Sequence, residues 1–283
     1  MNKPTQLTPH PHRLVIQAST GWSTLGLKDL WEYRDLLYFM VWRDLKGRYR
    51  QTALGPVWII LQPLLSMVLY TLIFGAIAKL PSEGRPYAVF SYVALLPWGF
   101  FSTAFSNGVN GLSGGLGLSS KVYFPRLIVP LSNILSSLMD LGISFVILFG
   151  MLIFYDIRPT WGIIFLPIYL LLAASIGLGV GLWFSGLVVK FRDIGQVTSY
   201  LVRVWMYATP VVYSIEIVPE QWRLLYRLNP MTGVIEGFRW ALLGTGQAPD
   251  WLLMSLSGLI SFLVLVIGIY IFKRVERSIV DLA

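Results

Sequence analysis

Residues 161–187 read WGIIFLPIYLLLAASIGLGVGLWFSGL and contain no charged side chain. A helix needs about 20 apolar residues to cross the hydrocarbon core of a bilayer, so this stretch predicts a membrane span. Within it, Ala173, Gly177 and Gly181 recur every four residues, which places them on one helical face. Such a face lets a second helix approach closely. Glycine is also common in membrane helices generally, so the pattern alone leaves both interpretations open.

The composition of the whole chain agrees with a membrane protein. Of 283 residues, 55% are hydrophobic and 13% are charged, and the mean hydropathy is +0.67. Soluble domains are typically about 45–50% apolar and about 25% charged. The absence of cysteine excludes disulfides and thiolate chemistry. The two histidines, His10 and His12, lie in a Pro-rich N-terminal tail, so we predict neither histidine catalysis nor a metal site in the membrane body.

Further apolar stretches predict an all-α integral membrane protein with six transmembrane helices, because backbone polar groups in hydrocarbon must pair internally. The expected spans are 57–78, 87–109, 131–155, 161–187, 196–213 and 252–272. Residues 1–28 are expected to form a flexible cytoplasmic tail and residues 29–283 the transmembrane domain.

The basic residues predict the orientation. With the N-terminus inside, 15 of the 22 Lys and Arg residues fall in cytoplasmic segments. This asymmetry favours the cytoplasmic membrane with both termini in the cytoplasm. No early apolar run is long enough for a signal peptide. Because the cations flank apolar spans, the net charge of +8 indicates anionic lipids rather than nucleic acid.

Residues 29–50, DLWEYRDLLYFMVWRDLKGRYR, combine apolar residues at helical spacing with aromatic rings and a basic end. This pattern predicts an amphipathic helix at 30–50 lying in the membrane interface. An ordinary juxtamembrane cluster that only sets topology is the alternative.

Two connections are predicted to have functions of their own. The Gly-rich loop in 107–130 has the wrong spacing for a phosphate-binding loop and is expected to dock on another protein, or else to be a plain flexible loop. The external segment 214–251 is amphipathic, so we expect helices at 216–243 that dip back into the outer leaflet. They are expected to form an exit gate containing Trp222, Tyr226 and Phe238, or an interfacial helix pair without a gating role.

Within the expected spans lie two charges, Asp140 and Arg203, which should face each other, a hydrated cavity or an anionic substrate. Snorkelling of Arg203 to the cytoplasmic face is the alternative. A set of aromatic residues could stack on sugar faces and let a polymer slide. These candidate channel residues are Tyr70, Phe74, Tyr200, Trp205, Tyr207 and Tyr213. No nucleotide motif or cluster of intramembrane carboxylates is present in the sequence, so a partner ATPase is the expected energy source.

Four segments resemble the membrane subunit of polysaccharide-exporting ABC transporters, which move O-antigen, capsule or teichoic-acid chains. They are WRDLKGRYRQTALGPVWIILQPL (42–64), KVYFPRLIVP (121–130), KFRDIGQ…YATPVVYS (190–214) and LNPMTGVIEGFRWALLG (228–244). The resemblance implies a homodimer bound to two cytoplasmic ATPase subunits, which bind ATP and Mg while this chain holds no cofactor. It also implies a channel lined mainly by the first and fifth spans for a polyprenyl-pyrophosphate-linked glycan.

By the same resemblance, the loop 110–124 would couple to the ATPase, and the cytoplasmic entrance would receive the pyrophosphate. The coupling candidates are Gly114, Gly115, Lys121 and Tyr123, and the head-group candidates are Arg43, Arg48, Arg50 and Arg203. Two alternatives stay open: an ABC permease for a small lipid or drug, and a membrane-embedded glycan-modifying enzyme. The enzyme would need a polar catalytic cluster, which the sequence does not show.

Overall fold

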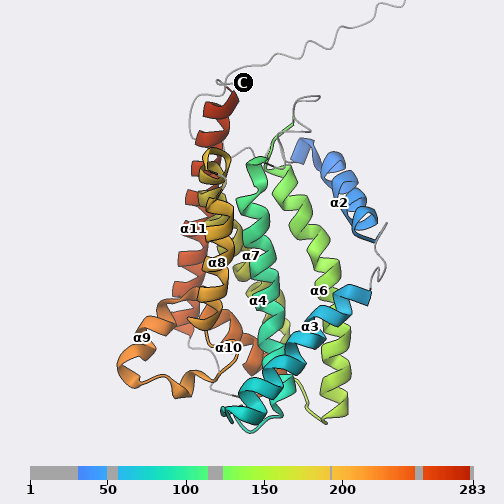
Figure 1. Cartoon of the computed structure of the whole chain (residues 1–283), viewed down its shortest axis with the longest axis vertical. Helices are drawn as coiled ribbons and strands as arrows, with labels where there is room; N and C mark the ends of the chain where they lie inside the picture. Colours follow the sequence, from blue (N-terminus) through green and yellow to red (C-terminus); the bar gives the residue numbers. More distant parts are fainter. Residues whose placement is uncertain (1–30, 50–56, 114–123, 192, 246–250, 281–283) are drawn as a thin grey trace, which may run out of the picture.

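The computed structural model describes residues 31–49, 57–113, 124–191, 193–245 and 251–280, and these form helices joined by turns, with no strand among them (Figure 1). The elements are α2 (Arg34–Tyr49), α3 (Val57–Tyr70), η2 (Thr71–Ile77), α4 (Tyr87–Val109), α6 (Ile128–Phe154), η3 (Trp161–Phe165), α7 (Leu166–Lys190), α8 (Ile194–Tyr207), η4 (Ile215–Ile217), α9 (Glu220–Leu228), α10 (Pro230–Leu243) and α11 (Trp251–Val280). The all-helical expectation is therefore confirmed for the part of the chain described.

Five helical segments of the described residues are long and apolar enough to cross a membrane. They are Val57–Ile77, Tyr87–Val109, Ile128–Phe154, Trp161–Lys190 and Met254–Glu276. A multi-pass membrane protein follows from these lengths.

The helix in the remaining expected span, α8, is shorter than the range 196–213. It has 14 residues, which is about 21 Å at 1.5 Å per residue, against a hydrocarbon core of about 30 Å. It ends at Tyr207, and residues 208–213 form turns and bends. Pro210 explains the end, because proline lacks an N–H and disfavours helical backbone in the residue before it.

The packing centre is the pair α4 and α7, which run beside each other (Figure 1). Gly177 of α7 lies so close to α4 that a Cβ there would sit 2.5 Å from the Phe101 carbonyl oxygen. Gly181 likewise faces the Phe105 carbonyl one turn further along. Ala173 is also fully buried. The repeat of small residues therefore does serve helix packing.

Substitution of Gly177 by alanine tests this contact. Since the new methyl group would overlap backbone of α4, we expect a loss of about 1–3 kcal/mol in the free energy of unfolding. Gly150 of α6 is the matched control, because nothing lies within 4 Å of a Cβ built there. Thermal unfolding in detergent should show a lowered midpoint for Gly177→Ala. The midpoint of Gly150→Ala should not be lowered. Equal midpoints in the two variants would contradict the close approach.

Helix α2 lies against the first half of α6, and its apolar residues point in two directions. Met40 and Leu45 are buried, while Tyr38, Phe39 and Trp42 are exposed. The exposed rings suit a membrane interface, where aromatic side chains concentrate. In Figure 1, α2 and the C-terminal end of α11 lie at one end of the molecule, and α9 and α10 lie at the other.

Candidate functional site

Helix α8 is strongly two-sided. Thr198 and Val202 are buried. The opposite side carries Gln196, Val197, Ser199, Tyr200, Arg203, Val204 and Tyr207, all exposed. Gln196, Tyr200, Arg203 and Tyr207 follow one another at intervals of three or four, which places them along the middle of one helical face. We call these seven residues the α8 face, and it combines two tyrosine rings, one amide, one serine hydroxyl, one cation and two valines.

Arg203 lies in the middle of the α8 face, between Tyr200 and Tyr207. It makes no ion pair with any residue that the structure describes. The expected pairing with Asp140 is not seen, since Asp140 belongs to α6, and α4 lies between α6 and α8 in Figure 1. A cation facing acyl chains is costly, so the α8 face is suited to water or to an anionic group rather than to lipid.

The other four candidate channel rings, Tyr70, Phe74, Trp205 and Tyr213, are partly buried and pack against the core of the subunit. Trp205 is half-buried, with its ring edge-on to Phe101 at 5.0 Å and its Nε1 donating to Asn229 Oδ1 over 3.3 Å. Tyr70 is also half-buried, with its hydroxyl 3.8 Å from Met206 Sδ and its ring 5.9 Å from that of Phe74. Of the six rings, the structure therefore places only Tyr200 and Tyr207 on the α8 face.

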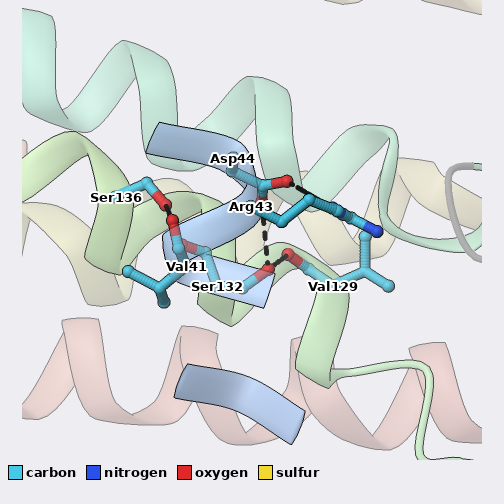
Figure 2. A network of polar contacts seen from close by, with 6 residues as sticks. All are labelled: Val41, Arg43, Asp44, Val129, Ser132 and Ser136. Atoms are coloured by element: carbon cyan, nitrogen blue, oxygen red, sulfur yellow. Dashed lines mark hydrogen bonds and ion pairs between the residues drawn. The ribbon is translucent and has the colours of Figure 1, made fainter. Parts of the chain in front are cut away.

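Among the predicted head-group cations, Arg43 is already paired. Its Nε and Nη2 donate to Asp44 Oδ1 over 3.0 and 2.8 Å. Figure 2 shows the surrounding network, in which Ser132 Oγ lies 3.5 Å from Asp44 Oδ2 and Ser136 Oγ lies 3.4 Å from the Val41 carbonyl oxygen. The network joins α2 to α6 through Asp44 and the Val41 carbonyl, and Arg43 pairs with Asp44 while 42% of its side chain stays exposed. The side chains of Arg48 and Arg50 lie outside the described residues.

The predicted coupling residues Gly114, Gly115, Lys121 and Tyr123 also lie outside the described residues, but both ends of their loop are placed. On one side, a Cβ at Gly111 would lie 3.2 Å from the Phe272 ring of α11. On the other side, Phe124 packs with Met40 of α2. Next to it, Arg126 Nε lies 3.8 Å from Glu276 Oε1 of α11. The loop ends are therefore attached to α2 and α11.

Of the predicted gate residues, only two lie at the periphery. Trp222 is exposed on α9, and the Tyr226 hydroxyl lies 3.1 Å from that of Tyr213. Phe238 of α10 is fully buried, with its ring 6.1 Å from Tyr169 and 6.3 Å from Phe145. The structure thus places Phe238 in the core of the subunit, where it has no surface to offer a passing chain.

Sequence reasoning missed Arg239 of α10, a completely buried arginine. It donates to the carbonyl oxygens of Val211 and Tyr213 over 2.9 and 3.2 Å and pairs with Glu236 at 3.1 Å. Its guanidinium carbon lies 3.7 Å from the centre of the Phe90 ring, a cation–π geometry. Burial raises the pKa of the Glu236 carboxyl, and Arg239 opposes this shift. Arg239 therefore fixes the turn after α8 to α10 and α4.

Two further hydrogen bonds hold the same turn. The Tyr87 hydroxyl of α4 donates to the Val212 carbonyl, and Ser214 Oγ donates to Glu83 Oε1 over 2.7 Å. The sequence does carry a signal for the burial of Arg239: Glu236 and Arg239 lie three residues apart on an otherwise apolar helix. Such a spacing predicts an ion pair along the helix, and the apolar surroundings predict its burial.

The sequence profile described as ABC-2 type transporter matches residues 35–243. The O-antigen export system permease protein RfbA of Myxococcus xanthus is 31% identical over 226 residues, which cover 79% of this chain and 86% of that protein. RfbA of Klebsiella pneumoniae is 26% identical over 252 residues, covering 88% and 95%. The polysialic acid transport protein KpsM of Escherichia coli is 20% identical over 250 residues, covering 83% and 92%. The membrane-spanning helices of the structure are those expected of a transporter membrane subunit. The chain belongs to the ABC-2 type transporter membrane family.

Proposed function

We propose that this chain is the permease subunit of an ABC transporter that exports a polysaccharide such as an O-antigen. The observation that carries the proposal is the similarity, over most of the chain, to permeases named for O-antigen export. The α8 face supports it, because exposed tyrosines with amide and hydroxyl neighbours suit the apolar faces and hydroxyl groups of sugars. A transport subunit of this kind is not itself an enzyme.

A homodimer completes the passage in this proposal. Two copies meet with their α8 faces toward each other, so that each Arg203 faces a hydrated path instead of lipid. The turn at 208–214 continues α8 toward the external side and makes this region the sixth crossing. The chain then lies in the cytoplasmic membrane with both termini in the cytoplasm, in agreement with the excess of cations on that side.

Two copies of a separate ATPase supply the energy, binding ATP and Mg in their own sites. They dock on the loop 110–124, whose attachments to α2 and α11 carry the movement into the membrane domain. The cargo is a polyprenyl-pyrophosphate-linked glycan. Arg43, Arg48, Arg50 and Arg203 are the cations proposed for its head group, and Arg43 keeps 42% of its side chain exposed beside Asp44.

Removal of the chain from its host tests the function. Surface polysaccharide should disappear, while lipid-linked polymer accumulates at the cytoplasmic face. A plasmid copy should restore export only when the ATPase subunit is present. Surface and cytoplasmic glycans are compared by electrophoresis of fractionated cells. Normal surface polysaccharide together with a changed lipid composition would favour the small-lipid alternative instead.

A further inference from the structure

The external helices differ sharply in how they are held. Helix α10 packs on α4 and α7 and contains twelve buried residues, among them Arg239 and Phe238. Helix α9 has no buried residue. Its Leu224 and Leu225 are 66% and 59% exposed. Burial resists displacement, so α10 is a fixed scaffold and α9 is the part of the external segment that can move.

The junction between these two helices is a single well-anchored residue, Asn229. Its backbone is extended, at φ −74° and ψ 111°, so the helical path breaks there. Its side-chain oxygen accepts from Met231 N over 3.1 Å, which caps α10, and its nitrogen donates to Thr209 Oγ1 over 2.9 Å. The C-terminal end of α9 is therefore a fixed pivot attached to α10 and to the turn after α8.

The rest of α9 has two further sets of contacts. Arg223 donates to the carbonyl oxygens of Val218 and Glu216 over 2.9 and 3.1 Å, in the turn before α9, and two tyrosine hydroxyls connect α9 to α8. The Tyr213 hydroxyl donates to the Tyr207 carbonyl oxygen over 2.7 Å, and the Tyr226 hydroxyl lies 3.1 Å from the Tyr213 hydroxyl. Because Tyr213 has one hydroxyl proton and gives it to Tyr207, Tyr226 must be the donor in the second bond. The two rings also meet edge to face, with their centres 6.5 Å apart.

We propose that Tyr213 is a positioning residue that sets the position of α9, connecting it through Tyr226 to the last residue of the α8 face. In this arrangement α9 moves together with residues 216–218, to which Arg223 is hydrogen-bonded, and Asn229 is the pivot. A cargo that displaces Tyr207 breaks the first hydrogen bond, which releases α9. The consequence for export rests on the proposed function, whereas the position of α9 does not.

Spin-label distances test the position of α9 directly. The chain has no cysteine, so labels can be placed at Leu224→Cys on α9 and at Arg158→Cys on the fixed external turn after α6. The labelled chain is diluted with unlabelled chain in the reconstituted transporter. Tyr213→Phe and Tyr226→Phe should each raise the ratio of molecules with a displaced α9 to molecules with α9 in its observed position. The expected increase is about fivefold, because each substitution removes one neutral hydrogen bond.

The double variant Tyr213→Phe/Tyr226→Phe should match either single variant, because all three lack the same bond between hydroxyls. Tyr207→Phe should leave the distances unchanged, since the accepting group is the backbone carbonyl. Tyr270→Phe on α11 is the control for loss of an exposed tyrosine hydroxyl. Unchanged distance distributions in both Tyr213→Phe and Tyr226→Phe would overturn the proposal.

Export measured in the same variants separates the two proposals. Shifted distances with altered export of long chains support both. Shifted distances in a transporter that moves no polysaccharide under any condition would refute the proposed function and leave the positioning role intact. Altered export with unshifted distances would refute the positioning role.

Discussion

Replacement of Arg239 by methionine should strongly reduce the amount of folded protein. The substitution removes the donors of two buried carbonyl groups, those of Val211 and Tyr213. It also leaves the Glu236 carboxylate, whose side chain is only 30% exposed, without its partner. Breaking a buried ion pair from one side costs about 3–5 kcal/mol, a large share of the about 5–15 kcal/mol that stabilises a typical domain. Size-exclusion chromatography and thermal unfolding in detergent measure the loss.

A second substitution identifies the cause. Arg239→Met combined with Glu236→Gln should recover part of the stability, because the unpaired buried charge is then absent. Arg227→Met is the matched control, since Arg227 is exposed on α9 and should tolerate the change. An unfolding midpoint for Arg239→Met equal to that of the unchanged protein would show that the contacts of Arg239 do not stabilise the fold.

The apolar spans could be predicted from the sequence because hydrocarbon thickness sets a length that composition alone reveals. The early end of α8 could also have been found, since Pro210 interrupts the apolar run at the point where the helix stops. The contacts of Gly177 with α4 could not be predicted from the sequence, because a pattern of small residues predicts a close approach but does not identify the partner helix.

The spacing of the candidate channel residues along α8 determines which face of the helix each one lies on. Along α8, Tyr200, Arg203 and Tyr207 recur at intervals of three and four and share the α8 face. Trp205 falls with Val202 on the packed side. Helical spacing alone would have distinguished Trp205 from the tyrosines, since residues three or four apart lie above one another. The burial of Arg239 depends on α4 and the turn after α8, which sequence spacing cannot bring together.

Removal of the two exposed rings of α8, by Tyr200→Ala/Tyr207→Ala, should lower export of long chains about thirtyfold without unfolding the protein. Exposed side chains contribute little to stability, and each ring offers contact area to a passing sugar that is worth about 1 kcal/mol. Trp205→Ala should behave differently and destabilise the fold by about 2 kcal/mol or more, because its ring packs on Phe101 and its indole binds Asn229.

The two outcomes are distinguished by measuring surface polymer length and unfolding midpoint on the same preparations. Phe262→Ala/Tyr270→Ala is the matched control, since it removes two exposed rings from α11 instead of α8. If the cargo passes along the α8 face, the control should export chains of normal length while the Tyr200→Ala/Tyr207→Ala variant, equally stable, exports only short ones. Equal export by both variants would mean that the tyrosines of α8 face lipid or protein. The passage would then have to lie along another surface. Helix α3 would be the first candidate, because none of its residues is buried within the subunit.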